Sequence, residues 1–410
     1  MSDCCSAPGL LPFEQAVANM LSQVSPVTET LTLSIDQALH YVLAEDIASP
    51  LNVPPHNNSA MDGYAFAIES LITSKTLTLV GRSMAGAPFQ ASCQLGECIR
   101  IMTGAKMPSC CDSVEMQENV TVDGEQITFL QEKSFGSHVR NAGEDIKLDQ
   151  EVLQSGHTLT AVDIGVLASL GVAEVIVYRK LKVALIATGD ELKLPGQALR
   201  VGDIYESNSF VLAAMLKKLH VEVIDFGIIA DDFNAIKTAF IGADEQADAV
   251  ISSGGVSVGD ADYTKTVLDE LGEIGFWKIA MKPGKPFAFG KLPNSIFFGL
   301  PGNPVSALVT FHQLALVALT KMQNAEPLKR THLTVKCSSE LRKSPGRVDF
   351  QRGVFSVNES GENEVSSTGA QGSGILSSLA RANCFIVLPS EQGKVKAGEM
   401  VTVQLFDHFL

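Results

Sequence analysis

Four carboxylates, Glu191, Asp231, Asp260 and Asp262, each come shortly after an apolar run in the sequence. The carboxyl ends of neighbouring parallel strands meet at one sheet edge, so these acids are predicted to converge. For Asp231, and for its neighbour Asp232, helix capping is the structural alternative. Clustered acids repel one another unless a cationic group lies between them. Either Mg2+, held by oxygen ligands and substrate phosphates, or nearby lysines would relieve that repulsion.

Lysines are available in the segment FWKIAMKPGKPFAFG, which carries Lys278, Lys282 and Lys285. If 276–282 is extended, Lys278 and Lys282 project from the same side, because strand side chains alternate. Lysines on an exposed strand commonly protect a sheet edge. Three of them around a PGKP turn favour an oxyanion clamp.

Glycine-rich and polar sequences end the other apolar runs. The loop SSGGVSVG follows 248–253, and its backbone N–H groups could approach an anion closely; its candidate residues are Ser252, Gly254, Gly255, Ser257 and Gly259. A simple glycine-lined turn is the alternative, and neither the GxGxxG nor the Walker pattern is present. Thr188 ends another run, and Pro301 and Pro304 of GLPGNP either set a loop or open a helix whose positive end faces the pocket.

These segments need an α/β framework to bring them together. Continuous apolar strands are predicted at 182–188, 221–229, 248–253 and 295–300. Helices are predicted between and after them at 207–220, 231–243, 263–272 and 303–322. Apolar strands that alternate with amphipathic helices indicate a parallel sheet covered on both faces.

The rest of the chain has a different pattern of predicted secondary structure. An amphipathic helix is predicted at 10–24, short strands broken by Gly and Pro at 46–158, and a helix at 160–171. After about residue 330 the segments HLTVKC, NCFIVLP and MVTVQLF indicate strands of a second β domain.

The composition argues against some classes of binding partner. The 410 residues include 31 Lys and Arg against 46 Asp and Glu, a net charge of −15, which disfavours nucleic acid and anionic membranes as partners. The N-terminus lacks signal-peptide features, and we expect no apolar run to reach the roughly 18–20 residues of a membrane helix. The eight cysteines form no CxxC pair, so reduced thiols and a cytoplasmic location are expected, without a zinc site or disulfide framework.

Further motifs near the N-terminus contain Asp62, Thr103, Arg140, Glu144 and Asp145, and from the residues alone they are polar turns. Together with the segments above they form an ordered series: NSAMDGYA, IRIMTGA, GEDI, TGDEL, SSGGVSVGDADYTK, FWKIAMKPGKPFAFG, GLPGNPVSA, GRVDFQRG and STGAQGSG. The series resembles the molybdopterin molybdenumtransferases, the bacterial MoeA family to which the E domain of gephyrin belongs. The resemblance covers nearly the whole chain.

The resemblance implies a multidomain α/β plus β fold. Its parts are a central three-layer α/β domain with a parallel-rich sheet, similar to the molybdopterin-adenylylating (MoaB/MogA-like) proteins, a small glycine-rich β domain, a helical linking domain and a C-terminal β-barrel. The implied bounds are 1–45 with 147–178 for the linking domain, 46–146 for the small β domain, 179–328 for the α/β domain and 329–410 for the barrel.

The resemblance also implies an activity, the insertion of molybdate into adenylylated molybdopterin with release of AMP, assisted by Mg2+. Family members are homodimers whose cleft is shared between subunits, and transient contact with other proteins of molybdenum cofactor biosynthesis is expected. The alternatives are an ATP-dependent molybdopterin adenylyltransferase, a gephyrin-like scaffold without turnover, and a nucleotide or sugar-phosphate binder.

Carried over motif by motif, the catalytic residues are Asp62, Thr103, Asp145, Glu191, Asp231, Asp262, Lys278 and Lys282. The substrate-binding residues are Arg140, Thr188, Ser252, Gly254, Gly255, Ser257, Gly259, Lys285, Pro301, Pro304 and Ser373. The implied metal ligands are Asp262 with Glu191 or Asp231. Asp260 stands where relatives commonly have Glu, which preserves the charge.

Overall fold

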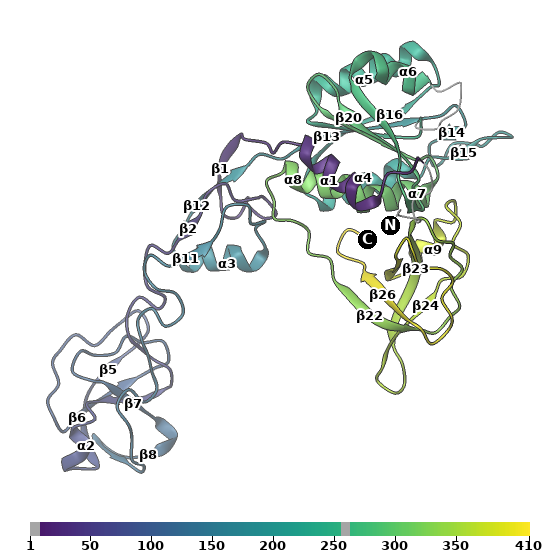
Figure 1. Cartoon of the computed structure of the whole chain (residues 1–410). Helices are drawn as coiled ribbons and strands as arrows, with labels where there is room; N and C mark the ends of the chain where they lie inside the picture. The colour runs from purple at the N-terminus through teal and green to yellow at the C-terminus, as the bar shows by residue number, and fades with distance from the viewer. Residues whose placement is uncertain (1–8, 256–262) are drawn as a thin grey trace, which may run out of the picture. The chain divides into compact units, whose positions relative to one another are not determined.

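The computed structural model describes residues 9–255 and 263–410 (Figure 1). It divides into two compact units. The larger unit contains the described residues up to Leu31, His40–Val42 and Val177–Leu410; the smaller unit contains Thr32–Leu39 and Leu43–Ile176. The chain passes between them within strands β1 (Thr30–Ser34) and β12 (Glu174–Tyr178), and also on either side of His40–Val42. The finer predicted division, with a separate linking domain, stays a prediction.

The larger unit is built on a mixed sheet that is mostly parallel. Its strands, in spatial order, are β16 (Glu222–Ile229), β13 (Lys182–Thr188), β17 (Ala249–Ser253), β21 (Ile296–Leu300), β20 (Pro286–Lys291) and β18 (Glu273–Lys278). The first four run parallel, and β20 and β18 are antiparallel to their neighbours. The predicted parallel-rich sheet is therefore confirmed, and its four parallel strands are the four apolar runs.

Helices cover both faces of this sheet (Figure 1). Along β13, Val183 and Leu185 belong to one core cluster, whereas Ala184 and Ile186 belong to another, as expected for alternating strand side chains. The first cluster includes helices α1 (Phe13–Gln23), α4 (Asn208–Lys218), α7 (Pro304–Thr310) and α8 (Leu316–Met322). The second includes α5 (Phe233–Gln246) and α6 (Tyr263–Leu271). The three-layer arrangement follows from these two clusters.

One apolar helix contradicts the expectation that no apolar segment reaches the length of a membrane helix. Helices α7 and α8 continue through a π-helical turn, η2 (Phe311–Ala315), and together span Pro304–Met322, 19 residues that are long and apolar enough to cross a membrane. In the structure, 89% of an 18-residue window of this span is buried inside the protein. Burial of this kind is typical of the core helix of a globular domain, whose apolar surface faces other side chains on all sides.

A closed sheet forms the C-terminal part of the larger unit. Its strands are β19 (Met281–Lys282), β23 (Val348–Val357), β24 (Asn363–Ser367), β22 (His332–Cys337), β26 (Met400–Leu405) and β25 (Cys384–Leu388), and pairing of β23 with β25 closes it. The predicted strands β22, β25 and β26 and the barrel are confirmed. The sequence did not indicate β23, because polar Gln351 and Arg352 interrupt its apolar pattern although both are buried.

The segment with the lysines is not one extended strand. Strand β18 ends at Lys278, and Lys282 lies on β19, which pairs with the C-terminal barrel. Between them, Leu11 donates its N–H to the Lys278 carbonyl and accepts from Ala280 N–H, both at 2.8 Å. Ile279 is buried there. The expectation of a single strand over 276–282 is therefore wrong, because Leu11 pairs with the chain at this point and the two lysines join different sheets.

The smaller unit is mostly β, as the short-strand pattern predicts. Its sheet has the order β7 (Ser113–Met116), β4 (Gly63–Phe66), β6 (Glu97–Ile101), β5 (Thr76–Ser83), β9 (Gln126–Phe129) and β8 (Val120–Asp123). Short pairs of strands join β3 (Asn58–Ser59) to β10 (Val139–Arg140) and β2 (Ile47–Ala48) to β11 (Glu151–Leu153). The predicted helix is α3 (Ala161–Ser169), which opens with a capping box between Thr160 and Asp163.

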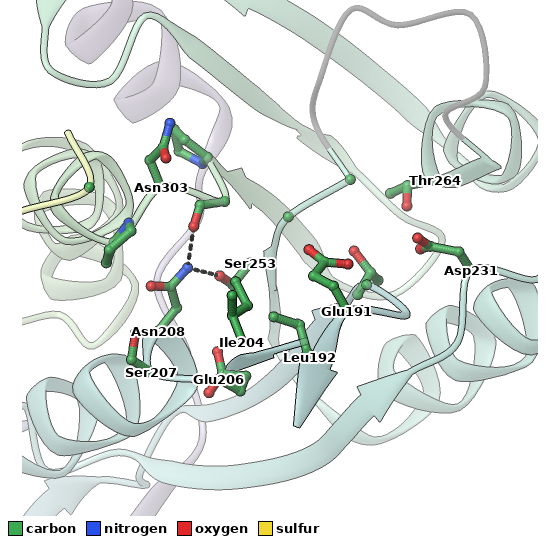
Figure 2. Close-up of a pocket in the computed structure, with 18 of the residues that line it drawn as sticks. Glu191, Leu192, Ile204, Glu206, Ser207, Asn208, Asp231, Ser253, Thr264 and Asn303 are labelled. Carbon is green, nitrogen blue, oxygen red and sulfur yellow. Dashed lines mark hydrogen bonds between the residues drawn. The ribbon is translucent and has the colours of Figure 1, made fainter. Parts of the chain in front are cut away.

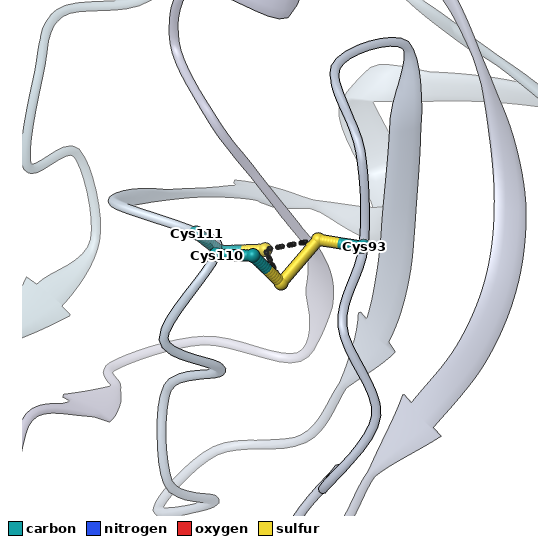
Figure 3. Close-up of side chains that lie close together, drawn as sticks. All are labelled: Cys93, Cys110 and Cys111. Atoms are coloured by element: carbon teal, nitrogen blue, oxygen red, sulfur yellow. Dashed lines mark hydrogen bonds between the residues drawn. A yellow bond between two sulfur atoms is a disulfide. The ribbon is translucent and has the colours of Figure 1, made fainter.

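The expectation that all cysteines are reduced thiols is wrong for two cysteines of the smaller unit. Cys93 and Cys110 form a disulfide, and the Cys111 sulfur lies beside both of its atoms (Figure 3). Spacing rules for CxxC pairs do not detect this bond, since 17 positions and strand β6 separate its partners and the fold brings the two loops together. The cytoplasmic location stays a prediction.

Candidate functional site

A cavity of about 890 Å³ lies in the larger unit at the carboxyl ends of β13, β16, β17 and β21 (Figure 2). This is the edge at which open α/β sheets bind ligands. Its volume is that of a pocket for a sizeable small molecule. The predicted site residues that line it are Thr188, Glu191, Asp231, Gly254, Gly255, Pro301 and Pro304.

The charged lining of the cavity is acidic. Glu191, Glu206 and Asp231 line it, and across residues 9–255 and 263–410 no Lys or Arg does. Figure 2 shows Glu191 and Asp231 toward one end of the cavity and Glu206 toward the other. An anionic substrate would need a cation here, and carboxylate oxygens are hard ligands of the kind that Mg2+ prefers.

The two adjacent aspartates that follow β16 have different roles. Asp232 caps α5, because its side chain accepts a hydrogen bond from Ala235 N–H at 2.9 Å. Asp231 lines the cavity instead. Burial, followed by the negative charges of Asp190 and Glu191, raises the pKa of Asp231 above its ordinary value. The capping alternative therefore applies to Asp232, whereas Asp231 lines the cavity and its predicted role stays a prediction.

The paired glycines at the end of β17 have backbone conformations that favour glycine. Gly254 has φ +96° and Gly255 has φ +66°. A Cβ on Gly255 would lie 2.3 Å from Thr264 Oγ1, and one on Gly254 would lie 3.0 Å from the Thr188 carbonyl oxygen. The Gly254 N–H donates to the Leu300 carbonyl at 3.1 Å, which ties β17 to the end of β21. These two glycines therefore shape the cavity wall at positions where a side chain would not fit.

The structure adds residues that sequence reasoning missed. Asn208 donates through Nδ2 to Ser253 Oγ and to the Gly302 carbonyl, each at 2.8 Å, and so ties three cavity segments together (Figure 2). Glu206 accepts the Ser209 N–H at 2.9 Å, and burial raises its pKa. The segment YESNS (205–209), at the start of the predicted helix 207–220, carried a usable signal, because a helix that follows a parallel strand begins at the same sheet edge.

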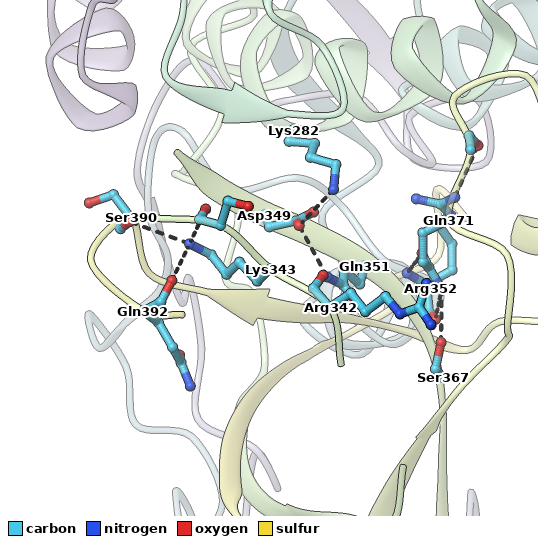
Figure 4. Close-up of polar contacts among 12 residues, drawn as sticks. Lys282, Arg342, Lys343, Asp349, Gln351, Arg352, Ser367, Gln371, Ser390 and Gln392 are labelled. Carbon is cyan, nitrogen blue, oxygen red and sulfur yellow. Dashed lines mark hydrogen bonds and ion pairs between the residues drawn. The ribbon is translucent and has the colours of Figure 1, made fainter. Parts of the chain in front are cut away.

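Several predicted site residues, catalytic and substrate-binding, do not line the cavity. Ser252 is fully buried on β17, and Lys278 and Lys285 are exposed. Lys282 forms an ion pair with Asp349 of the barrel at 3.3 Å (Figure 4). The lysine clamp is therefore not assembled around this cavity. Ser373 also lies outside the lining, although its neighbour Gly374 belongs to it.

The loop that carries Ser373 is held from the barrel by Arg352. The Arg352 guanidinium is buried and donates to Ser378 Oγ at 3.0 Å and to the Gly372 carbonyl at 3.1 Å. Gln371 accepts the Arg352 N–H at 2.8 Å (Figure 4). The Ser373 carbonyl in turn accepts the Val305 N–H at the start of α7. This chain of contacts connects the barrel to the cavity wall.

The remaining described candidates belong to the smaller unit. Asp62 accepts two hydrogen bonds from Thr103, from its N–H at 2.7 Å and from Oγ1 at 2.8 Å. The backbone bond, followed by the side-chain bond, lowers the pKa of Asp62. Arg140 and Asp145 are exposed. The structure thus pairs Asp62 with Thr103. Ser257, Gly259, Asp260 and Asp262 lie outside the described residues.

Three family models match the chain in succession. Residues 11–171 match the MoeA N-terminal region (domain I and II), residues 184–321 a probable molybdopterin binding domain, and residues 334–406 the MoeA C-terminal region (domain IV). The cavity lining lies almost wholly within the second match.

Full-length relatives agree with these models. A molybdopterin molybdenumtransferase from Haemophilus influenzae is 49% identical over 98% of this chain and 100% of its own. One from a Nostoc species is 33% identical over 97% and 93%. The crystal structure of a molybdopterin biosynthesis moeA protein from Pyrococcus horikoshii matches with a TM-score of 0.84 and 29% identity, covering 97% of this chain and 100% of that one.

Proposed function

The chain belongs to the molybdopterin molybdenumtransferase family, and we propose that its larger-unit cavity binds adenylylated molybdopterin together with molybdate. The protein is a transferase of molybdenum cofactor biosynthesis. The observation that carries the proposal is the cavity itself. Its volume suits a pterin nucleotide, and it lies almost wholly within the segment matched by the molybdopterin-binding model. Acids but no described basic side chains line it.

Glu191 and Asp231 would hold Mg2+ in this site. The donor set fits the ion, since carboxylate oxygens with remaining positions for substrate phosphates are its usual ligands. The raised pKa of Asp231 fits as well, because a neighbouring cation would relieve its repulsion with Asp190 and Glu191. When bound, Mg2+ supplies charge neutralisation at the phosphoanhydride. Asp262 is proposed as a further ligand.

The reaction moves the adenylyl group before molybdenum binds sulfur. A molybdate oxygen attacks the adenylyl phosphorus, the anhydride P–O bond breaks, and its electron pair stays with the molybdopterin phosphate. This attack forms a new phosphorus–oxygen bond. The original molybdenum–oxygen bond to the same oxygen then breaks, so that this oxygen leaves with AMP while the two dithiolene sulfurs bind molybdenum. The two thiol protons leave with one further oxygen as water. The chain's own part is to position the reactants, through Asn208, Gly254 and Gly255.

A homodimer would supply the remaining candidates. We propose that Asp62, Thr103, Arg140 and Asp145 of one subunit complete the cleft of the other. Lys278, Lys282, Lys285 and Ser373 do not line the cavity of their own subunit, and their roles stay predictions from the family resemblance. Mixing an inactive Asp62→Ala chain with an inactive Asp231→Asn chain tests this sharing. Recovery of activity on mixing supports it, and no recovery in a confirmed mixed dimer contradicts it.

The decisive experiment is incubation of the purified chain with adenylylated molybdopterin, molybdate and Mg2+, with AMP release and molybdenum incorporation measured together. We expect both products in equal amounts and no requirement for ATP. A requirement for ATP with no turnover of the adenylylated substrate would instead indicate an adenylyltransferase, and binding without turnover would indicate a scaffold.

Variants locate the activity in the cavity. Asp231→Asn and Asp262→Ala are expected to abolish most molybdate-dependent AMP release. Asp269→Asn is the matched control, because Asp269 is an exposed acid on α6 of the same domain outside the cavity lining. Near wild-type turnover by both site variants would contradict the proposed roles.

A further inference from the structure

Three cysteine sulfurs meet in the smaller unit. Cys93 lies in the loop before β6, and Cys110 and Cys111 lie in the loop between β6 and β7 (Figure 3). Cys93 and Cys110 are bonded, and the Cys111 sulfur lies 3.9 Å from Cys93 Sγ and 4.0 Å from Cys110 Sγ. All three side chains are half-buried. A disulfide needs only two of these sulfurs, so the position of the third calls for an explanation.

Three thiols that meet at one point can bind a metal cation together, because the cation displaces the thiol protons as it binds.

The sulfur spacing is that of a metal–thiolate site. With metal–sulfur bonds near 2.3 Å, neighbouring thiolates around a tetrahedral or trigonal zinc-like ion lie about 3.8–4.0 Å apart. The two non-bonded sulfur distances here are 3.9 and 4.0 Å. Opening of the Cys93–Cys110 bond would let the third distance reach the same value with small side-chain rotations.

The loop that carries two of the sulfurs is held in place independently of the disulfide. Asp112 accepts the Ile68 N–H at 3.0 Å and Ser113 Oγ at 2.7 Å, and its own N–H donates to the Phe66 carbonyl at 3.1 Å. The Asp112 carboxylate is thus engaged with strand ends of the sheet. Reduction of the disulfide would leave Cys110 and Cys111 positioned, and a water molecule would supply the fourth ligand.

We propose that Cys93, Cys110 and Cys111 form a reduction-dependent thiolate site for a thiophilic d10 cation of the Zn2+ class. A dithiol reductant donates two electrons and two protons, becoming a disulfide while Cys93 and Cys110 become thiols. Zn2+ then binds all three sulfurs and displaces three protons. In the oxidised chain two of the three ligands are unavailable to the metal.

Cobalt(II) substitution tests this site in the full chain. Cys4→Ser and Cys5→Ser are introduced into every sample, so that the N-terminal thiols do not contribute. We expect the reduced chain, freed of reductant under anaerobic conditions, to bind one equivalent of Co2+ with an intense sulfur-to-cobalt charge-transfer band. The band should vanish when Zn2+ is added. The oxidised chain should lack it, and carboxylates of the cavity do not produce it.

Serine variants and alkylation identify the ligands. Cys93→Ser, Cys110→Ser and Cys111→Ser should each lose the band, whereas Cys337→Ser, at a buried cysteine of the barrel, should retain it. Zn2+ should also protect Cys93, Cys110 and Cys111 of the reduced chain from iodoacetamide, read by mass spectrometry, and this measurement needs no variant to fold. Absence of both the band and the protection, or retention of the band in Cys111→Ser, would overturn the proposal.

Discussion

The backbone N–H of Asp231 donates a hydrogen bond to Oδ1 of Asp190 at 3.1 Å. This bond joins the loops that follow β13 and β16 at the edge of the cavity. It also brings two carboxylates close together, and with burial as the larger cause their proximity raises the pKa of Asp231. The carboxylates of Asp190 and Asp231 therefore repel each other at the site proposed for the cation.

Asp190→Asn should lower the pKa of Asp231 toward its ordinary value of 3.8, since the amide oxygen keeps the hydrogen bond while the charge is lost. With a raised folded-state pKa, the folded protein binds more protons than the unfolded one just above pH 3.8. The contribution of Asp231 to the free energy of unfolding is therefore lost as pH rises through that window. In the variant, the free energy of unfolding should depend less steeply on pH there. Carboxyl carbon NMR titration measures the pKa directly. An unchanged pKa in Asp190→Asn, with Asp269→Asn as the control, would show that burial and the Glu191 charge raise the pKa without a contribution from Asp190.

Asn208→Ala should reduce turnover through loss of two hydrogen bonds that connect α4 to Ser253 and Gly302. Loss of two such bonds costs about 1–2 kcal/mol, which corresponds to about a 5- to 30-fold decrease in kcat/KM if they act in the transition state. Gln246→Ala is the matched control, because Gln246 makes a comparable amide-to-carbonyl bond to Gly242 at 2.9 Å on α5. Equal effects of the two substitutions would count against a positioning role for Asn208.

The agreement between sequence and structure at this site has a physical basis. Parallel strands buried on both faces are continuous apolar runs, and their carboxyl ends must share an edge. The positions of Glu191, Asp231 and the Gly254–Gly255 pair at one cavity therefore follow from the order of strands and helices along the chain. The sequence pattern could not show that Asp232 caps the helix whereas Asp231 lines the cavity. That difference depends on the direction of each side chain at the start of the helix.

Long-range pairing accounts for what was missed. Lys278 and Lys282 were expected on one strand, but the contacts of Leu11 there come from a residue more than 260 positions away in the sequence. The Cys93–Cys110 bond likewise depends on two loops that only the folded sheet brings together. Strand β23 escaped detection because buried Arg352 and Gln351 satisfy their polar groups with hydrogen bonds that no local pattern records.

Arg352→Lys should loosen the loop 367–374, because lysine cannot donate to both Ser378 and the Gly372 carbonyl in the same fork geometry. Hydrogen bonds to a charged group are worth about 1.5–3 kcal/mol each, so we expect a local destabilisation of about that size. Hydrogen–deuterium exchange of the loop amides measures it, and turnover should fall because Gly374 lines the cavity. Arg381→Lys, at an exposed arginine beside α9 (Ser377–Ala380), should change neither. Unchanged exchange in Arg352→Lys would mean that the contacts of Gln371 and of the Ser373 carbonyl hold the loop without the guanidinium.

Thr103→Val should raise the pKa of Asp62 only part of the way to 3.8. The substitution removes the Oγ1 donor but keeps the Thr103 N–H, which is the larger cause of the lowered pKa. A lowered folded-state pKa means that the contribution of Asp62 to stability is present above pH 3.8 and is lost as pH falls through the folded value. The variant should therefore lose this contribution at a higher pH than the wild type.

Two measurements decide the outcome for Thr103→Val. NMR titration of the Asp62 carboxyl gives its pKa. Denaturant unfolding at pH values between about 2 and 5 gives the free energy of unfolding as a function of pH, over about the range in which an aspartate of lowered pKa titrates. Thr121→Val, at an exposed threonine of β8, is the matched control. If Thr103→Val leaves the Asp62 pKa unchanged, the backbone bond carries the whole effect. If the pKa returns fully to 3.8, the backbone bond depends on the hydroxyl, and the two hydrogen bonds act as one unit in holding Asp62 ionised for the proposed shared cleft.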